Sequence, residues 1–235
     1  MRAVQSRRLK IYRYLQNGRP ASGAEVPAGA QLLPPTMPTK IIAVGRNYAE
    51  HAKELGNEPP SEPIIFLKPP TALLPPEGTI IRPPQSQRVD YEGELAIVIG
   101  KRGRNVSADR WRDVVQGFTC ANDVTARDLQ KKDVQFTRGK GFDTFCPIGP
   151  CIETELDPAD VALVTRVNGQ IKQSGRTSQM VFPCSFLIEF ISAIMTLEQG
   201  DVILTGTPAG VGPLASGDDV EVEIEGIGTL RNHVA

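Results

Sequence analysis

Short apolar runs separated by turn residues dominate this chain of 235 residues. In the clearest run, Glu92 to Ile99, Leu95 and Ile97 lie two residues apart, which is the side-chain period of a β-strand. Similar runs predict further strands at 40–44, 64–67, 118–121, 161–167, 170–172, 202–204, 220–224 and 229–234. So many short strands between turn signals predict a β-rich chain.

Helical spacing is confined to a few segments. Asn47 is a good N-cap residue and Glu50 follows it three residues later, the pattern that opens a helix. Gly56 can end the same helix, which predicts a short helix at 47–55. Two more helices are predicted, at 107–115 and 185–199.

The connections between these elements indicate the fold class. Asn168-Gly169 lies between two apolar runs and is a strong signal for a β-hairpin. Strands and helices do not alternate regularly along the chain, so a doubly wound parallel sheet is not expected. The sequence therefore predicts an α+β, β-rich fold with a mostly antiparallel β core.

The charge composition argues against a nucleic-acid-binding protein. Lysine and arginine number 26 and aspartate and glutamate 27, so the net charge is −1 and no basic surplus exists to neutralise phosphates. The longest apolar stretch, 186–197, is interrupted by Glu189 and is too short to span a bilayer. We therefore expect neither a nucleic acid nor a membrane as a partner.

The cysteines and the N-terminus bear on the compartment. The four cysteines form no C-x-x-C pair, and two histidines are too few to complete a zinc site with them, so buried, reduced thiols of a cytoplasmic protein are expected. The first 19 residues carry six basic and no acidic side chains, which leaves organelle targeting open. The alternation of Leu9, Ile11 and Leu15 favours a first strand instead.

Three carboxylates are the first candidates for chemistry. Glu92 and Glu94 lie two residues apart on the clearest strand, so they point to the same face, and Asp123 follows the strand predicted at 118–121. Like charges side by side repel unless a cation lies between them. Three carboxylate oxygens suit a hard divalent ion such as Mg²⁺ or Mn²⁺. The alternative interpretation is that the two glutamates form a solvated face.

A histidine and a lysine are the next candidates. His51 and Glu54 lie three residues apart on a predicted helix, so they share one face. A carboxylate beside an imidazole fixes its tautomer and raises its basicity, which produces a base able to activate water. The alternative is an exposed ion pair without a catalytic role. Lys140, between Gly139 and Gly141, is either a group that stabilises an enolate or carboxylate or an ordinary loop lysine.

A glycine-rich segment follows the strand predicted at 202–204. The string at 204–212, Leu-Thr-Gly-Thr-Pro-Ala-Gly-Val-Gly, lacks the Gly-Lys-Ser/Thr of a P-loop and the G-x-G-x-x-G of a dinucleotide-binding turn. A strand rather than a helix is predicted after it, which also argues against nucleotide binding. A ligand-binding loop that carries threonine remains as the interpretation.

Four strings occur in the order that is typical of one family. They are Asp-Tyr-Glu-Gly-Glu-Leu at 90–95, Ala-Asn-Asp-Val-Thr-Ala-Arg-Asp-Leu-Gln at 121–130, Lys-Gly-Phe-Asp at 140–143 and Thr-Gly-Thr-Pro-Ala-Gly-Val-Gly at 205–212. On these strings the chain from about residue 40 onward resembles the fumarylacetoacetate hydrolase family, and its helix at 47–55 resembles that of the acylpyruvase and oxaloacetate decarboxylase branch. Residues 1–37 match poorly. We therefore expect a small, variable, β-rich N-terminal piece over 1–37 and a catalytic domain over 38–235.

The resemblance implies a fold, an assembly and a set of functional residues. The fold would be a mixed β-sandwich roll of the fumarylacetoacetate hydrolase C-terminal domain type, paired as a homodimer. Segment 182–183 and the loop after Lys68 would be places that set substrate choice. The implied roles are binding of Mg²⁺ or Mn²⁺ by Glu92, Glu94 and Asp123, activation of water by His51 with Glu54, contact with the substrate by Lys140, and orientation of substrate oxygens by Arg127, Gln130 and Thr207.

The resemblance implies divalent-metal-dependent cleavage of a C–C bond in a small 2-oxo acid, namely a 2,4-dioxo acid (an acylpyruvate hydrolase). Decarboxylation of oxaloacetate and keto–enol isomerisation pass through the same kind of enolate, which a metal would stabilise. The pairing of His51 with Glu54 favours hydrolysis. One alternative is an isomerase or decarboxylase of 2-hydroxyhepta-2,4-diene-1,7-dioate-type intermediates of aromatic catabolism. The other is a β-rich binding module that uses a divalent ion only to order its loops.

Overall fold

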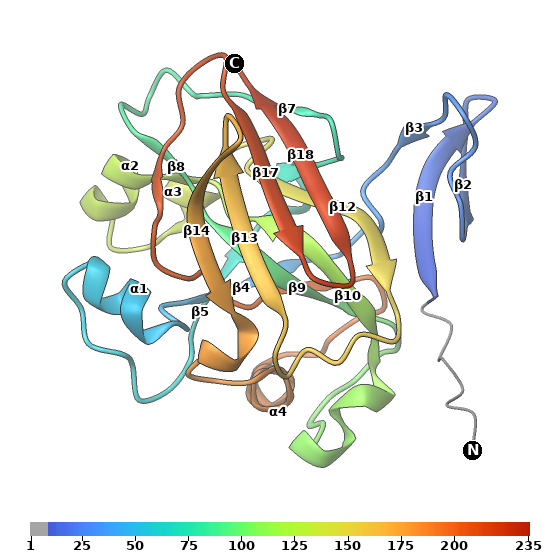
Figure 1. Ribbon diagram of the computed structural model, residues 1–235. Coiled ribbons are helices and arrows are strands. Elements are labelled where there is room, and N and C mark those ends of the chain that lie inside the picture. The colour runs from blue at the N-terminus through green and yellow to red at the C-terminus, as the bar shows by residue number, and fades with distance from the viewer. Residues whose placement is uncertain (1–8) are drawn as a thin grey trace.

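Three β-sheets form the body of the protein in the computed structural model, which describes residues 9–235 (Figure 1). The large, ten-stranded sheet has the order β2-β1-β12-β10-β9-β15-β4-β5, with β3 paired to β1 and β6 paired to β12. Its strands are β1 (Lys10–Gln16), β2 (Arg19–Gly23), β3 (Gln31–Leu32), β4 (Ile41–Gly45), β5 (Ile64–Lys68), β6 (Leu73–Leu74), β9 (Gly93–Ile99), β10 (Val115–Asn122), β12 (Cys146–Glu153) and β15 (Val202–Leu204).

Two smaller sheets and a few short helices complete the fold. The five-stranded sheet has the order β14-β13-β17-β18-β7 and the three-stranded sheet the order β11-β8-β16. Their strands are β7 (Thr79–Ile80), β8 (Val89–Tyr91), β11 (Thr125–Ala126), β13 (Ala162–Val167), β14 (Gln170–Arg176), β16 (Gly212–Pro213), β17 (Asp219–Ile224) and β18 (Gly228–Val234). The α-helices are α1 (Ala49–Glu54), α2 (Arg127–Lys132), α3 (Thr137–Lys140) and α4 (Cys184–Ile194), and the 3₁₀ helices are η1 (Pro70–Ala72), η2 (Ala108–Asp113) and η3 (Thr177–Gln179).

The five-stranded sheet covers one face of the large sheet (Figure 1). An apolar cluster between them contains Leu95 of β9, Phe118 of β10, Leu163 of β13 and Val222 of β17. A second cluster, which includes Ala96, packs on the opposite face of β9, so every residue of this strand is buried. The arrangement confirms the predicted α+β, β-rich fold with mixed sheets. It also makes β9 a rigid base for the side chains at its start.

Most of the local sequence predictions are confirmed. Each predicted strand has a counterpart, and the strands predicted at 161–167 and 170–172 form the hairpin β13–β14. Asn168 and Gly169 at its tip both have positive φ angles, 51° and 76°, as the two central residues of this kind of turn require.

The N-cap predicted for the first helix is wrong. Helix α1 has Tyr48 at its N-cap, and the side chain of Asn47 is buried and occupied elsewhere. Its Nδ2 donates hydrogen bonds to the carbonyl oxygens of Phe182 (3.0 Å) and Thr205 (2.7 Å), and its Oδ1 accepts one from the Phe182 amide (2.8 Å). A contact with distant parts of the chain has therefore replaced the local cap, and it anchors α1 to the body of the protein.

Strand pairing shortens the other two predicted helices. The segment at 107–115 forms only the 3₁₀ helix η2, because Val115 already pairs with β9 as the first residue of β10. Helix α4 ends at Ile194 rather than at residue 199, because Leu197 forms a β-bridge to the loop before η2. At the C-terminal end of each predicted helix, β-type backbone pairing with a neighbouring segment therefore outweighed the helical periodicity.

The N-terminal strands lie at the edge of the large sheet (Figure 1). Only Lys10 and Ile11 of β1 pair with β12, whereas β2 and β3 pair with β1. The first strand is confirmed, but the division into an N-terminal piece over 1–37 and a domain over 38–235 stays a prediction. Residues 1–8, which belong to the basic segment considered above as a targeting sequence, lie outside the described residues.

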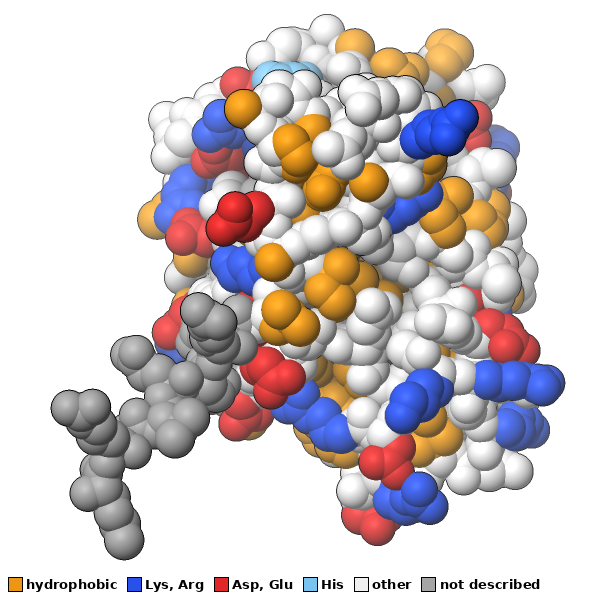
Figure 2. All heavy atoms as spheres, turned by 90° about the vertical axis from the view of Figure 1, so that its right-hand side faces the viewer, with side chains coloured by type: hydrophobic (Ala, Val, Ile, Leu, Met, Phe, Trp, Pro, Cys, Tyr) orange, Lys and Arg blue, Asp and Glu red, His pale blue; other side chains and the backbone are white. Residues whose placement is uncertain are grey.

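The surface charges are mixed in sign, and the cysteines are buried. On the face that carries the N-terminal strands, basic and acidic side chains lie next to one another rather than in patches of one sign (Figure 2). Among the described residues, no helix combines the length and apolar character needed to cross a membrane. All four cysteines are buried free thiols, as expected.

Asp201 joins the beginnings of two central strands. Its buried carboxylate, just before β15, accepts hydrogen bonds from the Thr39 amide (3.0 Å), the Thr39 hydroxyl (2.7 Å) and the Lys40 amide (3.1 Å), just before β4. The Lys40 ammonium and the Glu198 amide bind it as well. Burial alone would raise the pKa of Asp201, but the hydrogen bonds from Lys40, Glu198 and Thr39 outweigh it and hold the pKa below its usual value.

We expect Asp201→Asn to lower the free energy of unfolding by about 2 kcal/mol at pH 7, because it removes charge-assisted hydrogen bonds. A carboxylate whose folded-state pKa is lowered stabilises the protein above its unfolded-state pKa, and this stabilisation is lost as the pH falls through the folded-state value. The difference from wild type should therefore shrink below about pH 4. Urea unfolding at several pH values measures it, with the exposed Glu62→Gln as control. A difference that does not change with pH would contradict this account.

Candidate metal and substrate site

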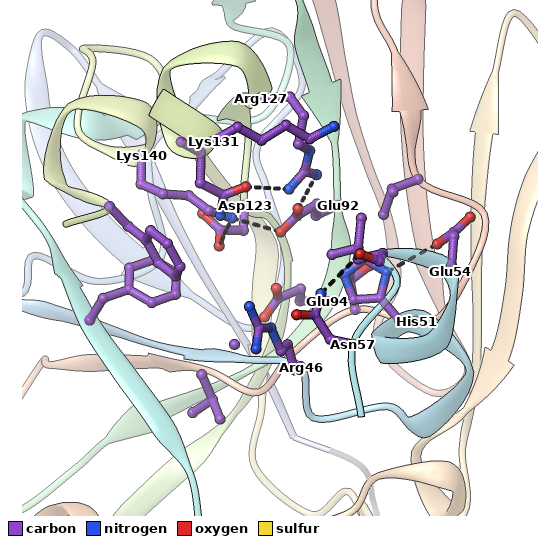
Figure 3. A pocket seen from close by; sticks show the side chains of 18 of the residues that line it. Arg46, His51, Glu54, Asn57, Glu92, Glu94, Asp123, Arg127, Lys131 and Lys140 are labelled. Carbon is purple, nitrogen blue, oxygen red and sulfur yellow. Dashed lines mark hydrogen bonds and ion pairs between the residues drawn. The ribbon is translucent and has the colours of Figure 1, made fainter. Parts of the chain in front are cut away.

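A cavity of about 560 Å³ opens beside the start of β9 (Figure 3). Its wall combines residues of β9, α1, β5, α2 and α3 with the loop between β15 and β16. All nine residues singled out from the sequence line it, namely His51, Glu54, Glu92, Glu94, Asp123, Arg127, Gln130, Lys140 and Thr207. The fold therefore brings together the residues predicted from separate motifs, while the role of each stays a prediction.

Pairing of β9 with β10 places the three carboxylates side by side. Glu92 lies between β8 and β9, Glu94 is the second residue of β9, and Asp123 directly follows β10. Gly93 pairs with Asn122, and the Asp123 amide donates a hydrogen bond to the Glu92 carbonyl oxygen at 2.8 Å. One carboxylate oxygen from each side chain lies within 4.8 Å of the others. All three side chains are buried, so the interpretation of the glutamates as a solvated face is wrong.

The two glutamates have opposite electrostatic surroundings. Burial alone would raise the pKa of Glu92, but the positive charges of Lys140 and Arg127 outweigh it and hold the pKa far below its usual value. Burial, with the nearby charges of Asp123 and Glu92, raises the pKa of Glu94 well above its usual value. The negative charge of Glu94 is therefore the least compensated of the three.

Three buried cations hold the acidic cluster together. The Lys140 ammonium donates to Glu92 Oε2 (2.7 Å) and Asp123 Oδ2 (2.6 Å), and the Lys68 ammonium donates to Asp123 Oδ1 (2.5 Å). Burial alone would lower the pKa of Lys140, but the charges of Asp123 and Glu92 outweigh it and raise the pKa. The third cation, Arg127, binds Glu92 through its Nη2.

Two members of this cluster were missed from the sequence. Lys68 ends the apolar strand β5, where a charged residue followed by two prolines gives only a weak signal. Asp90 lies in the same string as the glutamates and shares Arg127 with Glu92: its buried carboxylate accepts a hydrogen bond from Arg127 Nε at 2.9 Å. Asp90 therefore holds the arginine that in turn holds Glu92.

His51 and Glu54 form the predicted pair at the cavity wall, and the pair joins a buried imidazole to a partly exposed carboxylate. His51 Nδ1 lies 3.1 Å from Glu54 Oε2, and the imidazole is almost fully buried at the cavity wall. The other carboxylate oxygen of Glu54 accepts a hydrogen bond from the Gly210 amide at 3.0 Å. In the same glycine-rich loop, the Gly206 amide donates a hydrogen bond to Glu94 Oε2 at 2.7 Å. This loop therefore fixes both the histidine pair and the acidic cluster through its backbone.

The three residues predicted to orient substrate already have protein partners. Each of the three guanidinium nitrogens of the buried Arg127 has one partner, namely Asp90, Gln130 or Glu92. The Thr207 hydroxyl donates a hydrogen bond to the Gly93 carbonyl oxygen at 2.8 Å. Arg127 is thus placed to hold the acidic cluster, and Gln130 and Thr207 border the cavity.

The segments that were expected to set substrate choice are not among the described residues that line the cavity. Neither 182–183 nor the loop after Lys68 belongs to the lining formed by the described residues. Phe182 instead stacks on Phe186 of α4, with ring centroids 5.5 Å apart. Arg46, Asn57 and Lys131 lie at the rim, together with other lining residues (Figure 3).

The donor set fits Mg²⁺ or Mn²⁺. Three buried carboxylates that each offer one oxygen within 4.8 Å of the others match the preference of these hard cations for oxygen ligands. The raised pKa of Glu94 points the same way, because a cation between the carboxylates would relieve the repulsion that raises it. Glu92, Glu94 and Asp123 are therefore the residues that would hold the ion.

We expect Glu94→Gln to weaken binding of Mn²⁺ by more than about 100-fold, since it removes a proposed ligand charge. The metal-free variant should be at least as stable as wild type, because the amide oxygen can still accept the Gly206 hydrogen bond and the repelled charge is gone. Calorimetric titration with Mn²⁺ and thermal unfolding in EDTA measure the two effects. Unchanged affinity in a folded variant would remove Glu94 from the site.

Comparisons with known proteins show the family and agree with the fold. Residues 40–235 match the family model described as fumarylacetoacetate (FAA) hydrolase C-terminal. The mitochondrial oxaloacetate tautomerase FAHD2A of Bos taurus is 47% identical over 215 residues, which are 86% of this chain and 68% of the relative. The uncharacterized protein MJ1656 of Methanocaldococcus jannaschii is 59% identical over 197 residues, 84% of this chain and 83% of the relative.

Solved structures give the same result. A 5-carboxymethyl-2-hydroxymuconate delta-isomerase from Mycobacterium smegmatis superposes with a TM-score of 0.89 at 47% identity and covers 96% of this chain and 98% of its own. A 2-hydroxyhepta-2,4-diene-1,7-dioate isomerase from Mycobacterium marinum has a TM-score of 0.88 at 44% identity, with 97% and 98% covered. With the motifs, the fold and the family match in agreement, the chain belongs to the fumarylacetoacetate hydrolase family.

Proposed function

We propose that this protein is a divalent-metal-dependent enzyme that cleaves the C–C bond of 2,4-dioxo acids and releases pyruvate and a carboxylic acid. The observation that carries the proposal is the shared cavity, which both the His51–Glu54 pair and the acidic cluster line. The cavity thus combines a base for water with oxygen ligands for a divalent ion. The names of the relatives, a tautomerase and two isomerases of oxo or hydroxy acids, support this class of substrate.

Each group of the chain has a distinct task in this proposal. Mg²⁺ or Mn²⁺ held by Glu92, Glu94 and Asp123 would supply Lewis-acid polarisation of the 2-oxo group of the substrate. Glu54 accepts the hydrogen bond of His51 Nδ1, which leaves Nε2 as the unprotonated base. The buried ammonium of Lys140 supplies a positive charge for an enolate.

The proton and bond changes balance with one water molecule. Water gives a proton to His51 Nε2 while its oxygen forms a bond to C4 of the substrate. The C3–C4 bond then breaks, and its electron pair stays with the pyruvate part as an enolate while the carboxylic acid leaves. His51 returns the proton to C3, which yields pyruvate and restores the base.

A second candidate reaction is keto–enol isomerisation of oxaloacetate. It is favoured by the 47% identity to a protein named oxaloacetate tautomerase. This reaction also passes through an enolate but consumes no water, so His51 would only move a proton. Decarboxylation of oxaloacetate reaches the same enolate by loss of CO₂. The diene-dioate isomerases among the solved structures support a third, related substrate, a longer dicarboxylate.

A turnover panel separates these reactions. Acetylpyruvate, fumarylpyruvate and oxaloacetate are each incubated with Mg²⁺ or with EDTA, and ultraviolet absorbance and release of pyruvate are followed. We expect metal-dependent release of pyruvate from the 2,4-dioxo acids and loss of turnover in EDTA. Change of the oxaloacetate enol signal without pyruvate would favour the tautomerase. Binding of Mn²⁺ without turnover of any substrate would favour the binding module instead.

We expect His51→Asn to lower cleavage of 2,4-dioxo acids by about 10²–10⁴-fold, the usual contribution of a positioned base. Decarboxylation of oxaloacetate should change less, because it needs no activated water. Glu50→Gln is the matched control, since Glu50 lies on the same helix, is exposed and pairs only with Lys53 among the described residues. Steady-state kinetics on both substrates measure the difference. An equal loss of both activities would show that the histidine does not act on water.

A further inference from the structure

A buried glutamine behind the site connects two of its parts. Gln173 lies on β14 of the five-stranded sheet, is 1% exposed and does not line the cavity. Its Oε1 accepts a hydrogen bond from the Gly93 amide at 3.0 Å. Its Nε2 donates to the Thr207 hydroxyl at 2.7 Å and to the Pro208 carbonyl oxygen at 2.8 Å. One side-chain amide therefore binds the backbone between the two glutamates and the loop that carries Thr207.

These hydrogen bonds allow only one orientation of the amide. The Gly93 amide is a donor and requires the oxygen of Gln173, whereas the Pro208 carbonyl is an acceptor and requires its nitrogen. The Thr207 hydroxyl gives its own hydrogen to the Gly93 carbonyl, so it can only accept from Gln173. A flipped amide, or a side chain with fewer donors, would leave buried groups without partners.

The backbone at Gly93 packs closely against the five-stranded sheet, with no space for a side chain between them. A Cβ atom at Gly93 would lie 2.1 Å from Thr165 Oγ1 and 3.3 Å from Gln173 Oε1. Thr165 and Gln173 are cross-strand neighbours on β13 and β14, so the five-stranded sheet is in direct contact with the chain between Glu92 and Glu94. Contact with the sheet behind them therefore fixes the spacing of these two carboxylates.

We propose that Gln173 is a positioning residue that fixes the Glu92–Glu94 segment relative to the hydroxyl of Thr207. The inference rests on the proposed function for its kinetic part, because it assumes that these groups face one substrate. Residues that support metal ligands from behind typically contribute 10- to 100-fold to metal affinity or activity. A displacement of about 1 Å at a reacting group can cost on the order of 100-fold in rate.

The matched variants are Gln173→Met and Thr165→Val. Both remove a polar group that faces Gly93 with little change in volume, but only Gln173 makes hydrogen bonds there. The Thr165 hydroxyl is buried without a hydrogen-bond partner among the described residues, so Thr165→Val should leave stability, metal affinity and kinetics near wild type. Gln173→Glu is a second variant, since it keeps an oxygen for the Gly93 amide but lacks the two donors.

Three readouts are needed for each variant. Calorimetric titration with Mn²⁺ alone reports the carboxylates, hydrogen exchange reports the Gly93 amide, and steady-state kinetics separate kcat from KM on the best substrate of the panel. We expect Gln173→Met to weaken Mn²⁺ binding about 10-fold, to speed exchange at Gly93, and to lower kcat about 10- to 100-fold with a smaller change in KM. Gln173→Glu should retain more metal affinity than Gln173→Met, with a similar loss of kcat.

A double-mutant cycle tests the link between the two parts. Thr207→Val in the Gln173→Met background should lower kcat by less than the product of the single effects, because both changes break the same connection. A Gln173→Met variant with a lower melting temperature but unchanged Mn²⁺ affinity and kcat would overturn the proposal. So would a Thr165→Val variant that lowers Mn²⁺ affinity and kcat as much as Gln173→Met does. If wild type turns over no 2-oxo acid while Gln173→Met still weakens Mn²⁺ binding, the proposed function fails and the positioning of the carboxylates stands.

Discussion

Burial of several carboxylates in one place constrains the rest of this structure. Like charges at short range repel strongly where water cannot screen them, so the cluster needs buried cations with good hydrogen-bond geometry. Three different elements supply these cations, β5, α2 and α3. The carboxylates are Asp90, Glu92, Glu94 and Asp123, and the cations are Lys68, Arg127 and Lys140. Arg88 also pairs with Asp90, so Glu94 alone among these four carboxylates has no ion-pair partner in the described part of the chain. A divalent cation beside Glu94 would supply the missing positive charge.

Local patterns in the sequence were sufficient for the strands, the hairpin and the shared face of Glu92 and Glu94, because each depends on neighbouring residues. They were insufficient where distant segments compete for the same group. Asn47 has the features of an N-cap but binds the backbone around residue 182, 135 positions away. Lys68 and Gln173 carry no motif, and their partners in the site lie 55 and 80 positions away. Only the folded chain shows that Lys68 binds Asp123 and that Gln173 binds the Gly93 amide between the two glutamates.

The glycine-rich loop relates the two halves of the site to each other. Its amides bind Glu54 on the histidine side and Glu94 on the acidic side, so neither half can shift alone without losing a hydrogen bond. Gly210 has a φ of 102°, and a Cβ there would lie 2.2 Å from the Lys172 carbonyl oxygen. Gly210 is therefore required by close backbone contact with β14, the strand that also carries Gln173. The sheet behind the site thus supports both halves.

The division between an interior held together by buried ion pairs and a less constrained rim has a consequence for redesign. Arg127 and Lys140 already bind buried partners, so replacing either would disturb the common chemistry of all candidate reactions. Arg46 and Lys131 line the same cavity outside this network. A library of variants at such peripheral positions could change the length or charge of the substrate that the cavity accepts, while the buried ion pairs stay unchanged. Natural substitutions at the same positions could change the substrate in the same way during evolution.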